Sequence, residues 1–228
     1  LFGIHPLTAV GTDLLYAAIT KTAGTVAHSF NKAVDWRLVG LLAAGSAPAA
    51  ALTMIFIVGS GHDDPQMGAL IKIALGYALL LTATLLLFRH ALIEAITRWR
   101  AASDDANPML QNALTVAVGA FLGFLVSITS VGAGALGVTA LILLYPRMST
   151  HRIVASDIAH AVPLTFVSGS GYWYLGGVDF GMLGALLLGS IPGIVLGSLL
   201  SPKVPDRILR PLLAVVLAVV GLRLVWPS

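Results

Sequence analysis

The sequence predicts an all-α membrane protein built from two similar halves, and three observations support this. Of its 228 residues, 57% are hydrophobic and 10% are charged, whereas soluble domains carry about 45–50% apolar and about 25% charged residues. The mean hydropathy is +0.93, and the apolar residues gather in long stretches. Polar residues and prolines recur at equivalent positions in the two halves. This composition excludes an ordinary soluble enzyme, a disordered chain and a nucleic-acid-binding protein.

Six apolar stretches are long enough to cross a bilayer, which takes about 20 helical residues. They cover residues 7–30, 37–58, 67–90, 151–174, 180–201 and 206–226. A polar connector at 94–107 follows the third stretch. We therefore expect a first unit at 1–90, a connector at 91–110 and a second unit at 111–228.

The region 111–145 is apolar but is interrupted at 127–135 by hydroxyl-bearing and small residues. Two helical pieces of about 15 residues would each be about 22 Å long, which is too short to cross a membrane. The region therefore predicts a re-entrant hairpin. Irregular backbone at membrane depth is tolerated where it lines protein or a water-filled cavity.

The two halves align without a gap when the first is moved by 144 positions. This register joins Thr12 and Asp13 to Ser156 and Asp157, Val34 and Asp35 to Val178 and Asp179, and Gly45, Ser46 and Pro48 to Gly189, Ser190 and Pro192. Internal symmetry of this kind is typical of secondary transporters. By symmetry we expect a hairpin before Leu1 as well, which this sequence lacks.

Basic residues in the connectors predict the orientation of the halves. Four connectors carry Lys or Arg, at 32–37, 89–100, 147–152 and 203–210. All four lie on the cytoplasmic side only if the hairpin at 111–145 enters and leaves on the same side. The predicted fold is therefore two inverted repeats, each with one re-entrant hairpin and three transmembrane helices, spanning a bacterial inner membrane.

Asp13 and Asp157 are candidates for proton coupling or gating, one in each half. Carboxylates within a membrane are costly and usually face a cavity, where burial favours proton uptake. Helix capping is the alternative role for both. His160 lies on the same helical face as Asp157, so it is a candidate proton relay, with packing as the alternative.

Candidate substrate ligands lie near these carboxylates. Lys21 is about 12 Å along the helix from Asp13 and needs a partner, such as an anionic substrate, unless it reaches toward the membrane surface or neutralises an Asp elsewhere. Thr12 and Ser156 offer hydroxyls beside the two carboxylates.

The interruption at 127–135 is a further candidate anion site. Its glycines allow the backbone to approach a ligand closely, and a helix restarting near Ala133 would present unpaired N–H groups. Close packing of helices is the alternative use of such small residues. The candidate ligands here are Ser127, Thr129, Ser130, Gly132 and Gly134.

Other motifs predict structure rather than chemistry. The glycine series at 119 and 123 and at 189, 193 and 197 predicts close helix contacts. The adjacent residues His62, Asp63 and Asp64 lack the spacing of metal ligands. No nucleotide-binding or nucleophile motif occurs. The chain has no cysteine, and we expect no cofactor and no metal.

The run from His5 to Leu15, the Val-Asp-Trp-Arg sequence at 34–37, the segment 127–135 and Val154–Ile158 resemble the TauE/SafE family of membrane proteins. The resemblance implies a bacterial exporter of sulfite, sulfoacetate or related anions. The family's turn commonly reads Gly-Val-Gly-Gly-Gly, whereas this chain has Ser-Val-Gly-Ala-Gly at 130–134. Many members also have Thr-Ser where this chain has Thr12 and Asp13.

The sequence therefore predicts a secondary transporter that exports a small anion, with a proton gradient as the driver. A passive anion channel and an intramembrane enzyme are the alternatives. The expected partners are the anion and the lipid bilayer, with no nucleic acid, and a homodimer is one candidate for the oligomeric state.

Overall fold

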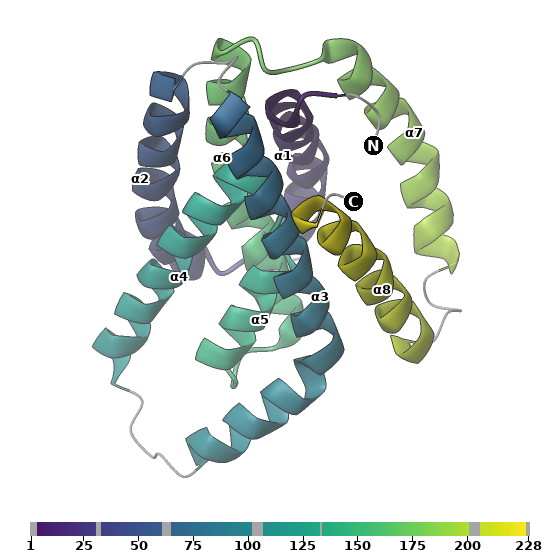
Figure 1. Cartoon of the computed structure of the whole chain (residues 1–228). Coiled ribbons are helices and arrows are strands. Elements are labelled where there is room, and N and C mark those ends of the chain that lie inside the picture. Colours follow the sequence, from purple (N-terminus) through teal and green to yellow (C-terminus); the bar gives the residue numbers. More distant parts are fainter. Residues whose placement is uncertain are drawn as a thin grey trace.

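The computed structural model describes residues 4–30, 33–60, 65–101, 107–132, 134–200 and 206–226, and all elements found in these ranges are α-helices. The expected Ala133 helix start, the His62–Asp64 group and Lys32 and Lys203 lie outside the described residues. Figure 1 shows the helices as one bundle, with α7 and α8 on one side.

Eight helices make up the described chain, in the order α1 Pro6–Phe30, α2 Trp36–Ser60, α3 Pro65–Ala101, α4 Pro108–Thr129, α5 Ala135–Leu144, α6 Thr150–Tyr174, α7 Phe180–Leu200 and α8 Asp206–Val225. Within the described residues, the helices long and apolar enough to cross a membrane are α2, α3, α4 and α6. Helix α1 has 25 residues but carries Asp13, Lys21 and several hydroxyls. The apolar parts found in α7 and α8 are shorter, at 180–190 and 211–225.

Helix α3 is longer than its predicted span. Its apolar part covers 66–88, and the helix then continues to Ala101. The predicted polar connector at 94–107 is therefore helical over most of its length. The composition indicated where the apolar span ends, but residues such as Glu94, Ala95 and Arg98 are good helix formers and allow the helix to continue.

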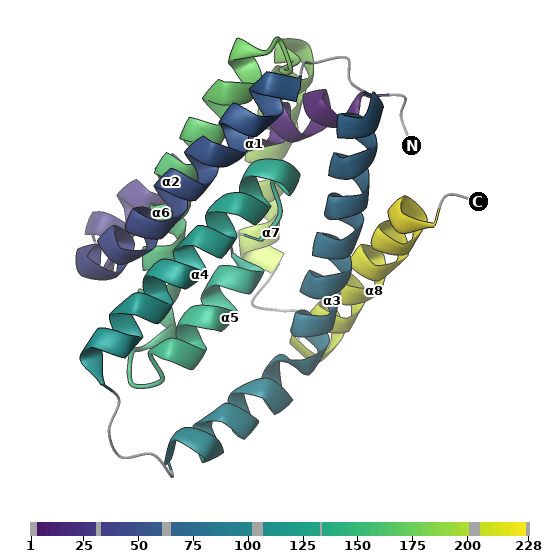
Figure 2. The ribbon, with the colours of Figure 1, turned by 60° about the vertical axis from the view of Figure 1, so that its left-hand side comes forward.

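Helices α4 and α5 form an antiparallel hairpin. The side-chain amide of Gln111 donates to the carbonyl of Leu144 at 2.6 Å, and the hydroxyls of Thr115 and Tyr145 lie 2.8 Å apart. These contacts bring the start of α4 to the end of α5, and Figure 2 shows the two helices side by side. The arms are unequal, with 22 and 10 residues, whereas the sequence predicted two equal pieces.

The break between the arms has a backbone reason. Ser130 ends α4 with a left-handed φ of 57°, and Gly132 and Gly134 follow with φ of 121° and 126°. Only glycine adopts the last two values without strain. The glycines therefore fix where the helix stops, and the sequence placed the break in the correct segment.

Helices α1 and α6 cross closely and run in opposite directions. A Cβ on Gly11 would lie 2.6 Å from that of Tyr172, and one on Gly169 would lie 2.8 Å from a Leu15 methyl group. Residues further along α1 therefore contact residues earlier in α6, as expected for antiparallel helices. Leu7, Val10, Leu14, Leu164 and Tyr172 belong to the main apolar cluster around this crossing.

Glycines also bring α2 and α4 into contact. A Cβ on Gly45 would collide with the carbonyl of Val116, and one on Gly119 would collide with the carbonyl of Leu42. The predicted close contact at Gly119 and Gly123 is confirmed, because Gly123 meets the backbone of Ser46. The same prediction is wrong for Gly189 and Gly193 of α7, where a Cβ would meet nothing within 4 Å among the described residues.

Candidate functional site

The equivalent hydroxyls of the two halves make reciprocal bonds. Thr12 on α1 accepts from the backbone N–H of Asp179 at 3.0 Å, and Ser156 on α6 accepts from that of Asp35 at 2.8 Å. Each hydroxyl therefore holds the start of a helix in the other half. Thr12 and Ser156 are both fully buried.

Asp35 and Asp179 in turn cap the helices that follow them. The Asp35 carboxylate accepts from the N–H of Leu38 at 3.2 Å, and that of Asp179 accepts from the N–H of Met182 at 2.9 Å. Such carboxylates satisfy N–H groups that have no partner within the helix. Asp35 also forms a salt bridge with Arg152 at 3.1 Å. Asp179 cannot form the equivalent salt bridge, because the residue that aligns with Arg152 is Thr8.

The two repeated carboxylates lie on either side of the hairpin break. The Asp13 carboxylate accepts from the hydroxyl of Ser130 at 2.7 Å, at the end of α4. A Cβ on Gly137 would collide with the carboxylate of Asp157, in the first turn of α5. Asp13 is exposed, whereas Asp157 is 1% exposed and buried.

Asp13 and Asp157 contact different ends of the hairpin break. Asp13 accepts from Ser130 at the end of α4, and Asp157 lies against Gly137 in the first turn of α5. The N–H of Gly137 donates to the Gly132 carbonyl at 3.2 Å, which holds the two ends of the break together. Lys21 interacts electrostatically with both carboxylates.

Asp157 and His160 carry buried polar atoms without partners. Oδ1 of Asp157 and Nδ1 of His160 make no hydrogen bond within the described chain. The other imidazole nitrogen, Nε2, shares a 2.7 Å hydrogen bond with the hydroxyl of Ser46 on α2. Asp157 and His160 share a helical face but are not joined by a hydrogen bond, and His160 connects α6 to α2 instead.

The hydroxyls near the break have mostly internal partners. Ser127 bonds with the hydroxyl of Ser168 at 2.7 Å, and the Tyr172 hydroxyl donates to the Ser127 carbonyl at 3.0 Å. Thr129 donates to the Leu125 carbonyl and accepts from the N–H of Val131. These bonds hold the end of α4 against α6, so the break has a defined shape.

The start of α5 has backbone N–H groups for which the described residues supply no acceptor. The N–H groups of Gly137 and Val138 reach the carbonyls of Gly132 and Gly134. No acceptor is found among the described residues for the N–H groups of Ala135 and Leu136, and no side chain caps the helix. Such an end attracts negative charge.

Sequence reasoning missed several residues that shape this site, among them Ser46, Gly137, Ser168 and Tyr172. The repeat register already contained Ser46, so its alignment with Ser190 was an available signal. No such signal existed for Gly137, because its role depends on how closely α6 approaches α5. No group of three potential metal ligands occurs in the part of the chain that the structure describes.

An apolar cavity of about 380 Å³ lies elsewhere, between α3, α4 and α5. Thr139 is the one polar residue lining it, and its hydroxyl already donates to the Ala135 carbonyl at 2.7 Å. The cavity therefore offers no charge to an anion.

Comparison with known proteins identifies the family of this chain. Residues 1–224 match the model of the family described as Sulfite exporter TauE/SafE. The chain belongs to the TauE/SafE family. A probable membrane transporter protein of Bacillus subtilis (strain 168), YjnA, is 38% identical over 229 residues, which is 99% of this chain and 87% of that protein. No solved structure matches the chain.

Membership of the TauE/SafE family makes the chain a multi-pass membrane transporter rather than an enzyme. The long apolar helices agree with this, since α2, α3, α4 and α6 each have the length and hydropathy of a membrane span.

Proposed function

We propose that this TauE/SafE protein is a proton-coupled secondary transporter that exports a small anion, such as sulfite or an organosulfonate, across a bacterial inner membrane. One observation carries the proposal. The break between α4 and α5 lies between two carboxylates from equivalent positions, Asp13 and Asp157, and Lys21 interacts with both.

Two inverted repeats form the framework of the proposed transporter. The antiparallel course of α1 and α6 supports this arrangement, and so do the reciprocal bonds of Thr12 and Ser156. The hairpin of α4 and α5 is re-entrant in the proposal, which the contact between Gln111 and Leu144 supports. Rocking of one repeat against the other then gives alternating access.

The anion binds at the hairpin break in this proposal. The open N–H groups at the start of α5 and the Lys21 ammonium supply positive potential. Gly132 and Gly134 leave the backbone accessible, because neither carries a side chain. The hydroxyls of Ser127, Thr129 and Ser130 line the break, whereas Thr12 and Ser156 act as positioning residues beside the two carboxylates.

Asp13 and Asp157 bind protons or gate the path from its two ends. Each carboxylate contacts a different end of the hairpin break, which supports two gates rather than one shared site. His160, one turn from Asp157, is hydrogen-bonded to Ser46 of α2. Binding of a proton or an anion near Asp157 therefore affects α2 as well as α6. The family description names sulfite, and that name supports the substrate class.

Liposome flux tests the proposal. The full chain, reconstituted in liposomes, should take up labelled sulfite faster under an imposed pH gradient. Asp13→Asn and Asp157→Asn should each lose that stimulation, since the amide cannot carry the proton. Asp179→Asn is the matched control, because its carboxylate only caps α7 and asparagine caps equally well.

The channel alternative gives a different result in the same preparation. A carrier saturates with anion concentration and turns over slowly, whereas a channel conducts without saturation at low concentration. Unchanged flux in both Asp13→Asn and Asp157→Asn would exclude these residues from coupling.

A further inference from the structure

Asp157 occupies an unusual position for a membrane carboxylate. It is 1% exposed, Oδ1 has no hydrogen-bond partner, and the carboxylate lies against Gly137 in the first turn of α5. A side chain at residue 137 would occupy the same space. The absence of a Cβ at this position is therefore what lets the carboxylate approach the N-terminal turn of α5.

The N-terminal turn of α5 is also the place where an anion would bind. Its helix has 10 residues and no capping side chain, and the N–H groups of Ala135 and Leu136 have no acceptor among the described residues. An anion seated there would meet the Asp157 carboxylate at close range. Two like charges at such a distance, in a site without bulk water, repel strongly.

We propose that the Asp157 carboxylate and the transported anion compete for the N-terminal turn of α5, so that the anion binds only when Asp157 carries a proton. This inference rests on the proposed anion transport. One proton is then bound with each anion and the two cross the membrane together, so the gradient of the anion itself, rather than the proton gradient, supplies the free energy of export.

The charges around Asp157 agree with this exchange. Asp13, Lys21 and Asp157 together carry a net charge of −1 when all are ionised, and protonation of Asp157 brings the sum to zero. Helices α4 and α5 contain no titratable side chain. The other titratable groups on the elements packed against α6 are Tyr16 and His28 on α1, and Asp35 and Arg37 at the start of α2.

These other groups differ from Asp157 in their partners. Asp35 pairs with Arg152 of α6, and Arg37 donates to Asn112. His160 and His28 remain as candidates, and His160 lies one turn from Asp157 with Nδ1 unpartnered. A test must therefore separate Asp157 from both histidines.

Anion binding to the full chain in detergent tests the competition. Methanesulfonate is a suitable probe, because its single negative charge stays constant from acid to alkaline pH. In the wild type its affinity should fall by up to about tenfold per pH unit over the range in which Asp157 loses its proton. In Asp157→Asn the affinity should be high and should change by less than about twofold over that range.

Three variants locate the effect. Asp179→Asn makes the same chemical change at the cap of α7, so its pH profile should match that of the wild type. His160→Gln retains a side chain able to bond with Ser46 and should also keep the wild-type profile, and so should His28→Gln. Loss of the pH dependence in His160→Gln with its persistence in Asp157→Asn would overturn the inference.

Proton counting gives a result that needs no variant. Calorimetric titration of the wild type in two buffers of different ionisation enthalpy should show uptake of about one proton per bound anion at alkaline pH. Binding without proton uptake would overturn the competition alone. Absence of methanesulfonate or sulfite binding at every pH would overturn the proposed function and this inference with it.

Discussion

At the scale of single residues, the contact between Ser46 and His160 is a buried polar link between two helices. His160 is 1% exposed and Ser46 is 2% exposed, and their atoms are 2.7 Å apart. Nδ1 of His160 already lacks a partner. Removing the Ser46 hydroxyl would leave the whole imidazole without hydrogen bonds, and a buried group in that state costs about 1–3 kcal/mol.

Ser46→Ala should therefore lower the free energy of unfolding by about 1–3 kcal/mol, measured by denaturation of the purified protein in detergent. Ser190→Ala is the matched control, since residue 190 aligns with residue 46. Its hydroxyl donates to the Leu187 carbonyl of its own helix, a bond that costs little to lose. Equal effects of the two variants would show that the His160 contact contributes nothing.

Single residues also show the limit of sequence reasoning. The register identified Thr12 and Ser156 as equivalent, and the structure gives them the same kind of bond. Their partners, the N–H groups of Asp179 and Asp35, did not follow from the sequence. Spacing along one helix tells which side chains share a face, but it does not tell what another helix brings to that face.

At the scale of elements, α2 and α7 have matching sequences in different surroundings. Gly45 of α2 lies against the Val116 carbonyl of α4, whereas Gly189 of α7 faces open space in the described structure. A methyl group at residue 45 would force two helix backbones apart, and such overpacking costs about 1–3 kcal/mol. The same methyl group at residue 189 meets no atom.

Gly45→Ala should accordingly destabilise the protein by about 1–3 kcal/mol. Gly189→Ala should be neutral or stabilising by up to about 1 kcal/mol, because alanine favours a helix over glycine. Thermal denaturation of the two variants in the same detergent measures the difference. A loss of stability in Gly189→Ala as large as in Gly45→Ala would mean that α7 is packed like α2.

Helix positions were more predictable than helix contacts. The expected spans begin and end within a few residues of α1, α2, α6, α7 and α8, because hydropathy and helix-capping residues are local signals. The unequal arms of the α4–α5 hairpin were not predicted. Their lengths depend on the left-handed Ser130 and on its bond to Asp13 of a distant helix.

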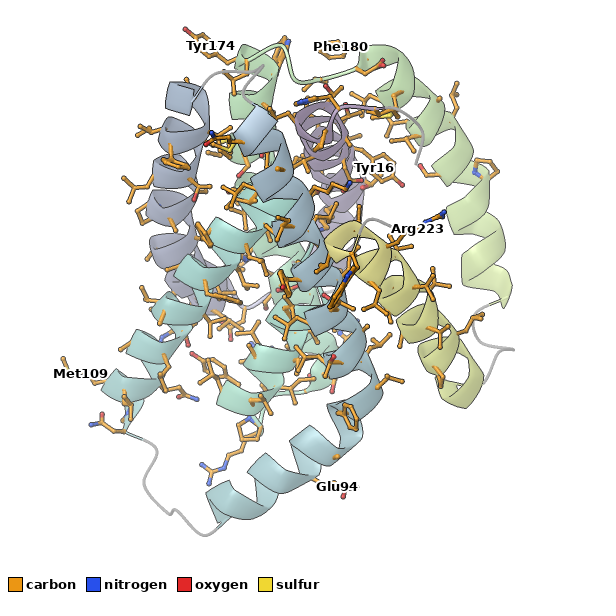
Figure 3. The ribbon with its side chains drawn as sticks, in the orientation of Figure 1. Tyr16, Glu94, Met109, Tyr174, Phe180 and Arg223 are labelled. Carbon is orange, nitrogen blue, oxygen red and sulfur yellow. The ribbon has the colours of Figure 1, made fainter. Side chains whose placement is uncertain are left out.

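At the scale of the whole molecule, the direction of each helix decides how the two halves face the membrane. Met109 and Glu94 lie at one end of the bundle, and Tyr174 and Phe180 lie at the other (Figure 3). Gln111 bonds to Leu144 near the end of the hairpin, which places the loop containing Arg147 beside the start of α4. Met109 and Arg147 should thus lie on one face, and the basic residues favour the cytoplasm.

Labelling of engineered cysteines tests this arrangement cleanly, because the chain has no cysteine of its own. Met109→Cys and Arg147→Cys should resist a membrane-impermeant maleimide in intact cells and react after permeabilisation. Tyr174→Cys, whose parent side chain is 85% exposed, should react in intact cells. Opposite accessibility of residues 109 and 147 would mean that the hairpin crosses the membrane. The two halves would then share one orientation, and rocking of inverted repeats could not open the site to both sides.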